Sequence, residues 1–180
     1  MKNKFGFVSL TGRTNVGKST LLNSFFQKKI AITSRKPQTT RNRILGILSE
    51  KDSQIVFLDT PGVHLGYKRQ LNKVMNKIAS HCYEEVDLVL FLIDRLKWQK
   101  EEENILNRLK TLNKPVVLVI NKIDRLKDKT KLLAFIKDIS QKFNFLSIIP
   151  ISALKKDNLL ELKKIILNNL DSGPFPFPDD

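Results

Sequence analysis

Eight residues near the start of the chain have the types and the spacing of a phosphate-binding loop, the P-loop. They fit the pattern G-x-x-x-x-G-K-[ST] and are Gly12, Arg13, Thr14, Asn15, Val16, Gly17, Lys18 and Ser19. The two glycines let the backbone curl so that several N–H groups point at one chain of phosphates. We expect Lys18 to reach the β- and γ-phosphates as a catalytic group, and the Ser19 hydroxyl to bind Mg²⁺. We also include Thr20 among the nucleotide-binding residues.

A second polar segment follows the apolar run 54–58 and consists of Asp59, Thr60, Pro61 and Gly62. An aspartate at the end of such a strand can hold Mg²⁺, usually through water. The N–H group of Gly62 is placed to sense a γ-phosphate, so we assign Gly62 a catalytic role. A turn built by the proline and the glycine is compatible with this function.

The polar loop 33–42 contains two neighbouring threonines, Thr39 and Thr40. A threonine hydroxyl in this loop can complete the Mg²⁺ shell when a triphosphate is bound, which makes the loop a nucleotide-dependent switch. We assign this catalytic and metal-binding role to Thr40 rather than to Thr39. The predicted Mg²⁺ ligands are therefore Ser19, Thr40 and Asp59. The alternative is an ordinary hydrophilic loop.

A third motif, N-K-x-D, consists of Asn121, Lys122 and Asp124 and follows the apolar run 116–120. The Asp124 carboxylate is a double acceptor that suits the N1–H and 2-amino groups of guanine, which adenine does not offer in that form. We expect Asn121 to tie this loop to the phosphate-binding loop, and the stem of Lys122 to cover the base. A site that must pair buried polar groups can reject the wrong base by roughly 10⁴-fold or more.

A short triplet, Ser152, Ala153 and Leu154, follows the apolar residues 147–149. The backbone N–H of Ala153 could donate to O6 of guanine, where adenine carries a donor instead. The triplet says little by itself, but it completes a set of residues that would bind a guanine nucleotide with Mg²⁺.

These motifs must be positioned by the elements around them, and apolar runs typical of buried parallel strands alternate with helical patterns. The expected strands are 4–10, 43–49, 54–58, 88–93, 116–120 and 147–149. The expected helices are 18–27, 69–82, 100–112, 130–142 and 159–170, the last with Asp157 or Asn158 near its N-cap.

This order of elements predicts an α/β protein with the three-layer fold of P-loop nucleoside triphosphatases. Its sheet should have six strands and be mostly parallel, with helices on both faces. The tight turn between 43–49 and 54–58 makes the first of these the one antiparallel strand. In such sheets the ligand lies beyond the carboxyl ends of the strands, where each motif falls.

Composition sets broad limits on the protein. The 180 residues fit one compact domain, and a single cysteine excludes an internal disulfide. We place Cys82 in the core, because it lies on an apolar stripe with helical spacing. No signal peptide or spanning segment is recognised, so we expect a cytoplasmic protein. The net charge of +14 favours a polyanionic partner only weakly, because the lysine, asparagine and isoleucine content is also what A/T-rich coding produces.

The last ten residues differ from the rest, because three of them between 174 and 178 are prolines. This composition excludes a helix and favours an extended, semi-rigid segment. We therefore divide the chain into a nucleotide-binding domain, residues 1–170, and a proline-rich linker, residues 171–180. We expect the linker to lead to a second domain; the alternative is a frayed terminus.

Four segments and the tail carry a more specific resemblance. Their amino-acid sequences resemble the GTPase domain of the bacterial Era family, within the translation-factor-related P-loop GTPases. The segments are 12–23, 34–44, 59–64 and 71–77, and the tail is 173–180. The resemblance implies a GTP-hydrolysing switch, bound to GTP or GDP with Mg²⁺, that assists small ribosomal subunit assembly and 16S rRNA maturation. It also implies a C-terminal KH domain that binds this rRNA, and association with the inner membrane as a peripheral protein. We expect a monomer.

The resemblance also bears on how hydrolysis would proceed. Val63 stands where Ras-like GTPases carry the glutamine that orients water, so we expect slow intrinsic hydrolysis. His64 is the next polar side chain, and we interpret it as an exposed loop residue rather than a catalytic one. In relatives, an asparagine at the position of Asn15 helps to hold K⁺ at the phosphates, which implies potassium-stimulated hydrolysis. The alternative is that Asn15 only braces the loop.

Three other functions remain open at this point. One is the GTPase module of a tRNA-modification or double-domain ribosome-assembly enzyme, against which the 71–77 segment and the start at Met1 argue. Another is a GTP-dependent RNA-binding module with little turnover. An ATPase is disfavoured by Asp124.

Overall fold

A computed structural model describes residues 3–26, 43–59 and 86–176. The expected helix 69–82 and the switch loop 33–42 lie outside the described residues. The strands are β1 (Lys4–Thr11), β2 (Arg43–Glu50), β3 (Ser53–Asp59), β4 (Leu88–Asp94), β5 (Val116–Asn121), β6 (Ser147–Pro150) and β7 (Asp171–Ser172). The helices are α1 (Lys18–Phe25), α3 (Lys100–Leu109), η1 (Ile123–Arg125), α4 (Thr130–Ser140) and α5 (Leu159–Asn168).

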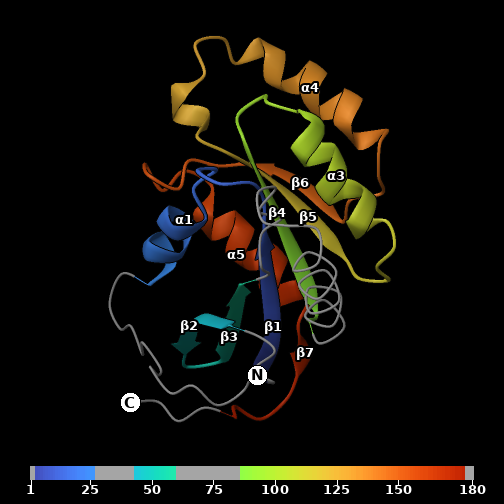
Figure 1. Cartoon of the computed structure of the whole chain (residues 1–180). Coiled ribbons are helices and arrows are strands. Elements are labelled where there is room, and N and C mark those ends of the chain that lie inside the picture. The colour runs from blue at the N-terminus through green and yellow to red at the C-terminus, as the bar shows by residue number, and fades with distance from the viewer. Residues whose placement is uncertain (1–2, 27–42, 60–85, 177–180) are drawn as a thin grey trace.

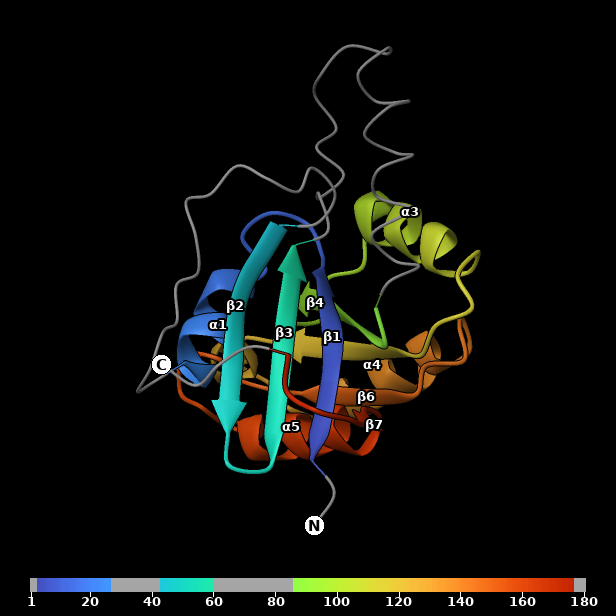
Figure 2. The same ribbon diagram turned by 90° about the horizontal axis from the view of Figure 1, so that it is seen from below.

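One mixed sheet organises these elements in the order β2-β3-β1-β4-β5-β6, with β7 beside β1 (Figure 1). The strands β3, β1, β4, β5 and β6 are parallel, and β2 runs antiparallel to β3, as Figure 2 shows. The expected α/β class and the antiparallel hairpin are thus confirmed. The carboxyl ends of the parallel strands share one edge, and the phosphate-binding loop leaves β1 at that edge.

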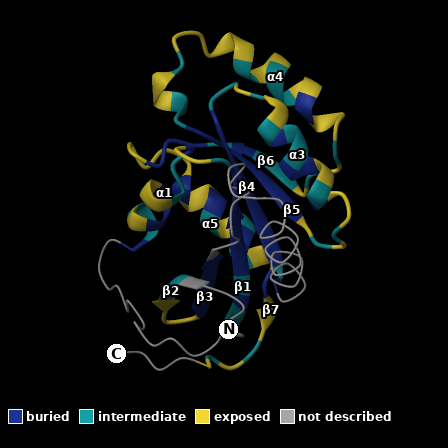
Figure 3. Ribbon diagram, in the orientation of Figure 1, coloured by how far each residue is buried: buried dark blue, intermediate teal, exposed yellow. Residues whose placement is uncertain are grey.

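Two apolar cores lie on opposite faces of the sheet. In β4, which is buried along its whole length, Leu88, Leu90 and Leu92 pack with α1 and α5. The residues between them, Val89, Phe91 and Ile93, pack with α3 and α4. This alternation follows from the two-residue period of a strand. It explains why the run is apolar throughout, since neither face of the strand meets water (Figure 3).

The short strand β7 corrects the expectation of six strands. Asp171 and Ser172, which we placed in the linker, pair antiparallel with Phe5 and Lys4 of β1. The Lys4 ammonium group also donates to the carbonyl of Leu170 at 2.7 Å. Two polar residues give no apolar pattern, so sequence reasoning could not distinguish this strand from a linker.

The helices end earlier than expected. α1, α3, α4 and α5 stop two or three residues before the predicted ends. Asn158 is the N-cap of α5, as expected, but its side chain makes no capping bond and instead donates to the carbonyl of Pro150 at 2.8 Å. No helix among the described residues combines the length and the apolar character that a membrane span requires.

Candidate nucleotide-binding site

Two glycines shape the loop between β1 and α1. Gly12 and Gly17 have φ angles of 145° and 102°, a region that residues with a side chain rarely adopt. A Cβ atom on Gly12 would lie 2.4 Å from the carbonyl oxygen of Leu92, and one on Gly17 would lie 2.2 Å from Nδ2 of Asn121. Both positions therefore require glycine, which is why the motif places them there.

Lys18 begins α1 and folds back over the loop. Its Nζ donates to the carbonyls of Gly12 and Arg13, each at 2.8 Å. The cation thus lies within the curl of the loop, where it can face a phosphate chain. Ser19 and Thr20 are exposed in the first turn of the same helix. A hydroxyl in this place is the kind of hard oxygen ligand that Mg²⁺ accepts, so Ser19 fits its predicted role.

Asn121 joins three loops through one side-chain amide. Its Nδ2 donates to the carbonyl of Val16 at 2.9 Å, which confirms the predicted tie to the phosphate-binding loop. Its Oδ1 accepts from the backbone N–H of Lys122 at 2.8 Å and from that of Ala153 at 3.0 Å. The N–H that we expect to meet O6 of guanine is therefore engaged by Asn121, and a bound base would have to share or replace this bond.

The carboxylate of Asp124 is held in place by the β6–α5 loop. Its Oδ1 accepts from the buried hydroxyl of Ser152 at 2.6 Å, and that hydroxyl accepts from the N–H of Lys155 at 3.1 Å. Asp124 itself is exposed, as a group that recognises a ligand must be. Leu154, in the same loop as Ser152, is 63% exposed and presents apolar surface to solvent.

Lys122 bridges the base loop and the phosphate loop. Its Nζ donates to the carbonyl of Asn15 and lies 3.3 Å from Oδ2 of Asp94. The side chain thus spans the gap between the two predicted binding segments, in keeping with its expected place over the base.

Asp94 is a site residue that sequence reasoning missed. It ends β4 beside Asn121 in the register of β4 and β5. Burial raises the pKa of its carboxyl group, but hydrogen bonds and charges from Arg95 and Lys122 outweigh this effect and lower the pKa below its ordinary value. Asp94 is therefore ionised at neutral pH. An acid at the end of a buried parallel strand, next to the strand that carries N-K-x-D, was the signal that could have found it.

Arg13 anchors the other end of the phosphate-binding loop. Its Nε lies 2.9 Å from Oε1 of Glu102, a residue of α3 that is fully buried. Its Nη1 donates to Oε1 of Gln99 at 2.9 Å and lies 3.4 Å from Glu101. Arg13 thus serves here to fix the loop to α3. Thr14 and Asn15 are exposed at the tip of the loop, and Val16 is buried beneath it.

Several predicted site residues are not covered by the structure. Asp59 ends β3, and only its backbone is described. Four of them lie outside the described residues, namely Thr40, Thr60, Pro61 and Gly62, as do Thr39, Val63 and His64, which were considered beside them. The structure thus brings together the phosphate-binding and base-binding segments, while the roles of the two switch segments stay predictions.

The sequence of this site is that of a known family. A model of the family described as "50S ribosome-binding GTPase" matches residues 7–122, from β1 through Lys122. The chain belongs to this family. The match includes the phosphate-binding loop, Asp94 and the first half of N-K-x-D.

Individual GTPases give a closer comparison. The chain is 50% identical over 175 residues to "GTPase Era" of Haemophilus influenzae (strain PittGG). It is also 50% identical over 175 residues to "GTPase Era" of Histophilus somni (strain 129Pt). In both cases the match covers 97% of this chain and 58% of the relative. The chain therefore spans less than two thirds of the length of these relatives.

Solved structures agree with this assignment. Era in complex with MgGDPNP and nucleotides 1506–1542 of 16S ribosomal RNA has a TM-score of 0.82 at 44% identity, over 99% of this chain and 61% of that one. An Aquifex aeolicus Era variant bound to GDP.AlF4⁻ has a TM-score of 0.80 at 45% identity, over 97% and 60% of the two chains. The P-loop GTPase fold of this family member is thus established.

Proposed function

We propose that this chain is a guanine-nucleotide-dependent switch domain that binds GTP and hydrolyses it to GDP and phosphate. The observation that carries this proposal is the hydrogen-bonding of Asn121, which joins the phosphate-binding loop, the N-K-x-D loop and the β6–α5 loop. One side chain thereby couples the sites for phosphate and for base. The family match and the Era neighbours support the same activity.

Different residues of the site would bind the phosphates, the guanine base and Mg²⁺. The helix α1 offers its N-terminus to the phosphates, and Lys18 adds a positive charge from within the loop. Asp124, held by Ser152, accepts from the edge of guanine. Ser19, with Thr40 and Asp59, would hold Mg²⁺, which supplies positive charge to the β- and γ-phosphates. The Era neighbour that contains MgGDPNP supports this metal.

Guanine selection is tested by Asp124→Asn. Asparagine keeps one acceptor and gains a donor, so the variant should bind xanthosine diphosphate better than wild type does and GDP more weakly. The loss for GDP should be roughly 10- to 150-fold, the range for hydrogen bonds to a charged group. Competition titrations with both nucleotides measure this.

The matched control for that test is Asp128→Asn. Asp128 is exposed nearby and its carboxylate accepts from the N–H and the hydroxyl of Thr130, away from the site. This control should keep the wild-type preference for GDP. If Asp124→Asn also kept it, Asp124 would not be the base-recognition residue.

We further propose that hydrolysis is slow and is stimulated by K⁺ near Asn15. The absence of a glutamine at position 63 supports the first part, and the exposed position of Asn15 at the tip of the loop supports the second. Phosphate release should be faster in potassium chloride than in sodium chloride of equal ionic strength. Asn15→Ala should remove that difference, and equal rates for the wild-type protein in the two salts would contradict the role of K⁺.

The cellular role is proposed from the relatives. We infer that the longer protein assists small ribosomal subunit assembly and 16S rRNA maturation, contacts this rRNA through a KH domain that follows residues 171–180, and acts as a monomer in the cytoplasm and at the inner membrane. The Era complex with 16S rRNA and the identity to Era support the ribosomal part. Cross-linking of the full-length protein to ribosomal RNA in cells tests it.

A further inference from the structure

We infer that Asp94 is a positioning residue that acts through Lys122 to fix the backbone of Asn15, and thereby sets the lifetime of the bound nucleotide. This inference rests on the proposed function and adds a residue outside the recognised motifs. Asp94 ends β4 and is 8% exposed, so its carboxylate is close to buried.

The carboxylate of Asp94 holds two cations, one on each oxygen. Oδ1 accepts from Nε of Arg95 at 2.8 Å, and Oδ2 lies 3.3 Å from Nζ of Lys122. The same Nζ donates to the carbonyl of Asn15. A chain of contacts thus runs from the end of β4, through the N-K-x-D lysine, to the tip of the phosphate-binding loop.

Several residues along this chain of contacts have a left-handed backbone conformation. Five non-glycine residues in the described part of the molecule have positive φ, and three of them are Asn15 (62°), Arg95 (52°) and Lys122 (64°). Such conformations persist only where the surroundings over-determine them, and they concentrate at ligand sites. The hydrogen bond from the N–H of Arg95 to the carbonyl of Asn121, at 2.9 Å, adds one more constraint.

The consequence concerns affinity rather than base choice. Without the charge of Asp94, the ammonium group of Lys122 loses its buried counter-ion and turns toward water. The carbonyl of Asn15 then loses its donor, and the lysine stem is no longer held between the two loops. GDP and GTP should both dissociate faster, while the preference for guanine, which depends on Asp124, should not change.

The test is a double-mutant cycle with Asp94→Asn and Lys122→Met, read out by the dissociation rate of fluorescent GDP. Asp94→Asn alone should speed dissociation about ten-fold, the scale of a lost hydrogen bond to a charged group. In the Lys122→Met background the same substitution should add little, because the contact through which it acts is already gone.

Two further variants separate positioning from general stability. Arg95→Gln removes a contact to the same carboxylate but none to Asn15, so it should leave GDP dissociation near the wild-type rate. Equal acceleration by Arg95→Gln and Asp94→Asn, or an undiminished effect of Asp94→Asn in the Lys122→Met background, would overturn the inference. If Asp94→Asn does not fold, Asp94→Glu takes its place in the cycle, because it keeps the charge but displaces it from Lys122.

The same experiment tells a failure of the inference from a failure of the proposed function. Wild-type protein that binds no guanine nucleotide would refute the proposed function. Wild-type protein that binds GDP with the same dissociation rate as Asp94→Asn would refute only the role of Asp94.

Discussion

Where the phosphate-binding loop meets the N-K-x-D loop, there is no room for even one additional side-chain atom on Gly17. Gly17 lies with its α-carbon against the amide of Asn121, and that amide donates to the neighbouring carbonyl of Val16. The glycine is thus needed twice: its φ angle of 102° excludes most side chains, and the space beside it is already filled.

Gly17→Ala should therefore abolish tight GDP binding. An added Cβ would meet Nδ2 of Asn121 at 2.2 Å and push the side chain away from its three hydrogen bonds. The positive φ adds about 1–2 kcal/mol of backbone strain for an alanine. Gly173→Ala is the control, because a Cβ there meets nothing within 4 Å. Calorimetric titration with GDP measures both, and tight binding by Gly17→Ala would contradict this account of the loop.

At the residue scale, the motifs predicted the tie between Asn121 and the phosphate-binding loop, but not the other contacts that hold the site residues in place. The glycines, Lys18, Asn121 and Asp124 follow from motifs whose spacing is set locally. The ion pair of Arg13 with Glu102 joins residues far apart in sequence, and nothing in the pattern of either segment indicates it. The role of Asp94 likewise depends on the strand order, which places β4 beside β5.

At the scale of elements, a cluster around Trp98 joins α3 to the segment that follows α4. The indole N–H donates to Oε2 of Glu103 at 2.7 Å, and Nζ of Lys142 lies 3.3 Å from the same oxygen. The bond from Trp98 is the main reason that the pKa of Glu103 is lowered; burial opposes it, and Lys142 and Lys110 add smaller lowering effects.

Glu103→Gln should destabilise the fold in a pH-dependent way. Because the pKa of Glu103 is lower in the folded state, its ionised form stabilises the fold at neutral pH, and this contribution is lost as the pH falls through the lowered value. The difference in unfolding free energy should be less than about 1 kcal/mol at pH 7, since the side chains of Lys142 and Glu103 are 40% and 38% exposed and their attraction is screened by water. Urea unfolding at stepwise lower pH should show the difference shrinking.

A suitable control is Glu161→Gln, an exposed acid on α5 that pairs with Lys164. It should change the unfolding free energy less than Glu103→Gln does at pH 7, because the pair with Lys164 is more exposed and no indole N–H is described at Glu161. A Glu103→Gln difference that stayed constant on acidification would mean that packing, and not the charge, joins α3 to the segment after α4.

Most elements were predictable because a strand buried on both faces, or a helix with one buried face, leaves a periodic apolar pattern. The strand β4 and the helix α5 are examples, and both lie where the pattern places them. The strand β7 was not predictable, because its two polar residues are held by backbone hydrogen bonds to β1. The ends of the helices were less predictable, because apolar periodicity does not mark the residue at which a helix stops.

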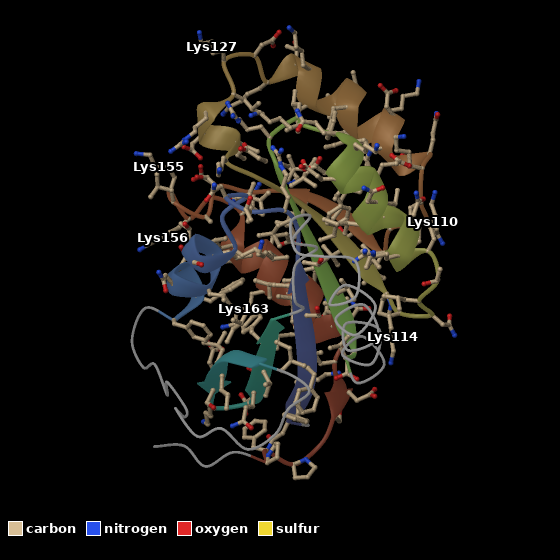
Figure 4. All side chains as sticks on the ribbon, in the orientation of Figure 1. Lys110, Lys114, Lys127, Lys155, Lys156 and Lys163 are labelled. Atoms are coloured by element: carbon tan, nitrogen blue, oxygen red, sulfur yellow. The ribbon has the colours of Figure 1, made fainter. Side chains whose placement is uncertain are left out.

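At the scale of the whole molecule, positive charge lies on both ends of the sheet. Lys127, Lys155 and Lys156 lie on the loops after β5 and β6, at the nucleotide edge, whereas Lys110 and Lys114 lie between α3 and β5 at the opposite edge (Figure 4). A switch can control a partner only through surface that responds to the nucleotide, so the first group is the more informative one to change.

We expect this chain alone to bind single-stranded RNA weakly, with a Kd of about 10⁻⁴ to 10⁻⁶ M at physiological salt, as for non-specific contacts with phosphate. Lys155→Gln with Lys156→Gln should lower the salt dependence of binding by about 0.7 per lost contact. The control pair, Lys110→Gln with Lys114→Gln, should change it less. Fluorescence anisotropy over a salt series measures this. Equal slopes for the two double variants would mean that lysines at either edge of the sheet contribute equally to RNA binding.

The strand order also bears on how the domain forms during synthesis. The strand β1 is made before all of its partners, which are β3 at Ser53–Asp59, β4 at Leu88–Phe91 and β7 at Asp171–Ser172. The central strand therefore lacks its two long parallel neighbours until first β3 and then β4 have been made. Pairing across such distances in sequence carries a large loop-closure cost. A growing chain would need protection of this apolar strand until β3 and β4 have left the ribosome, and β7 adds only a two-residue pairing at the end.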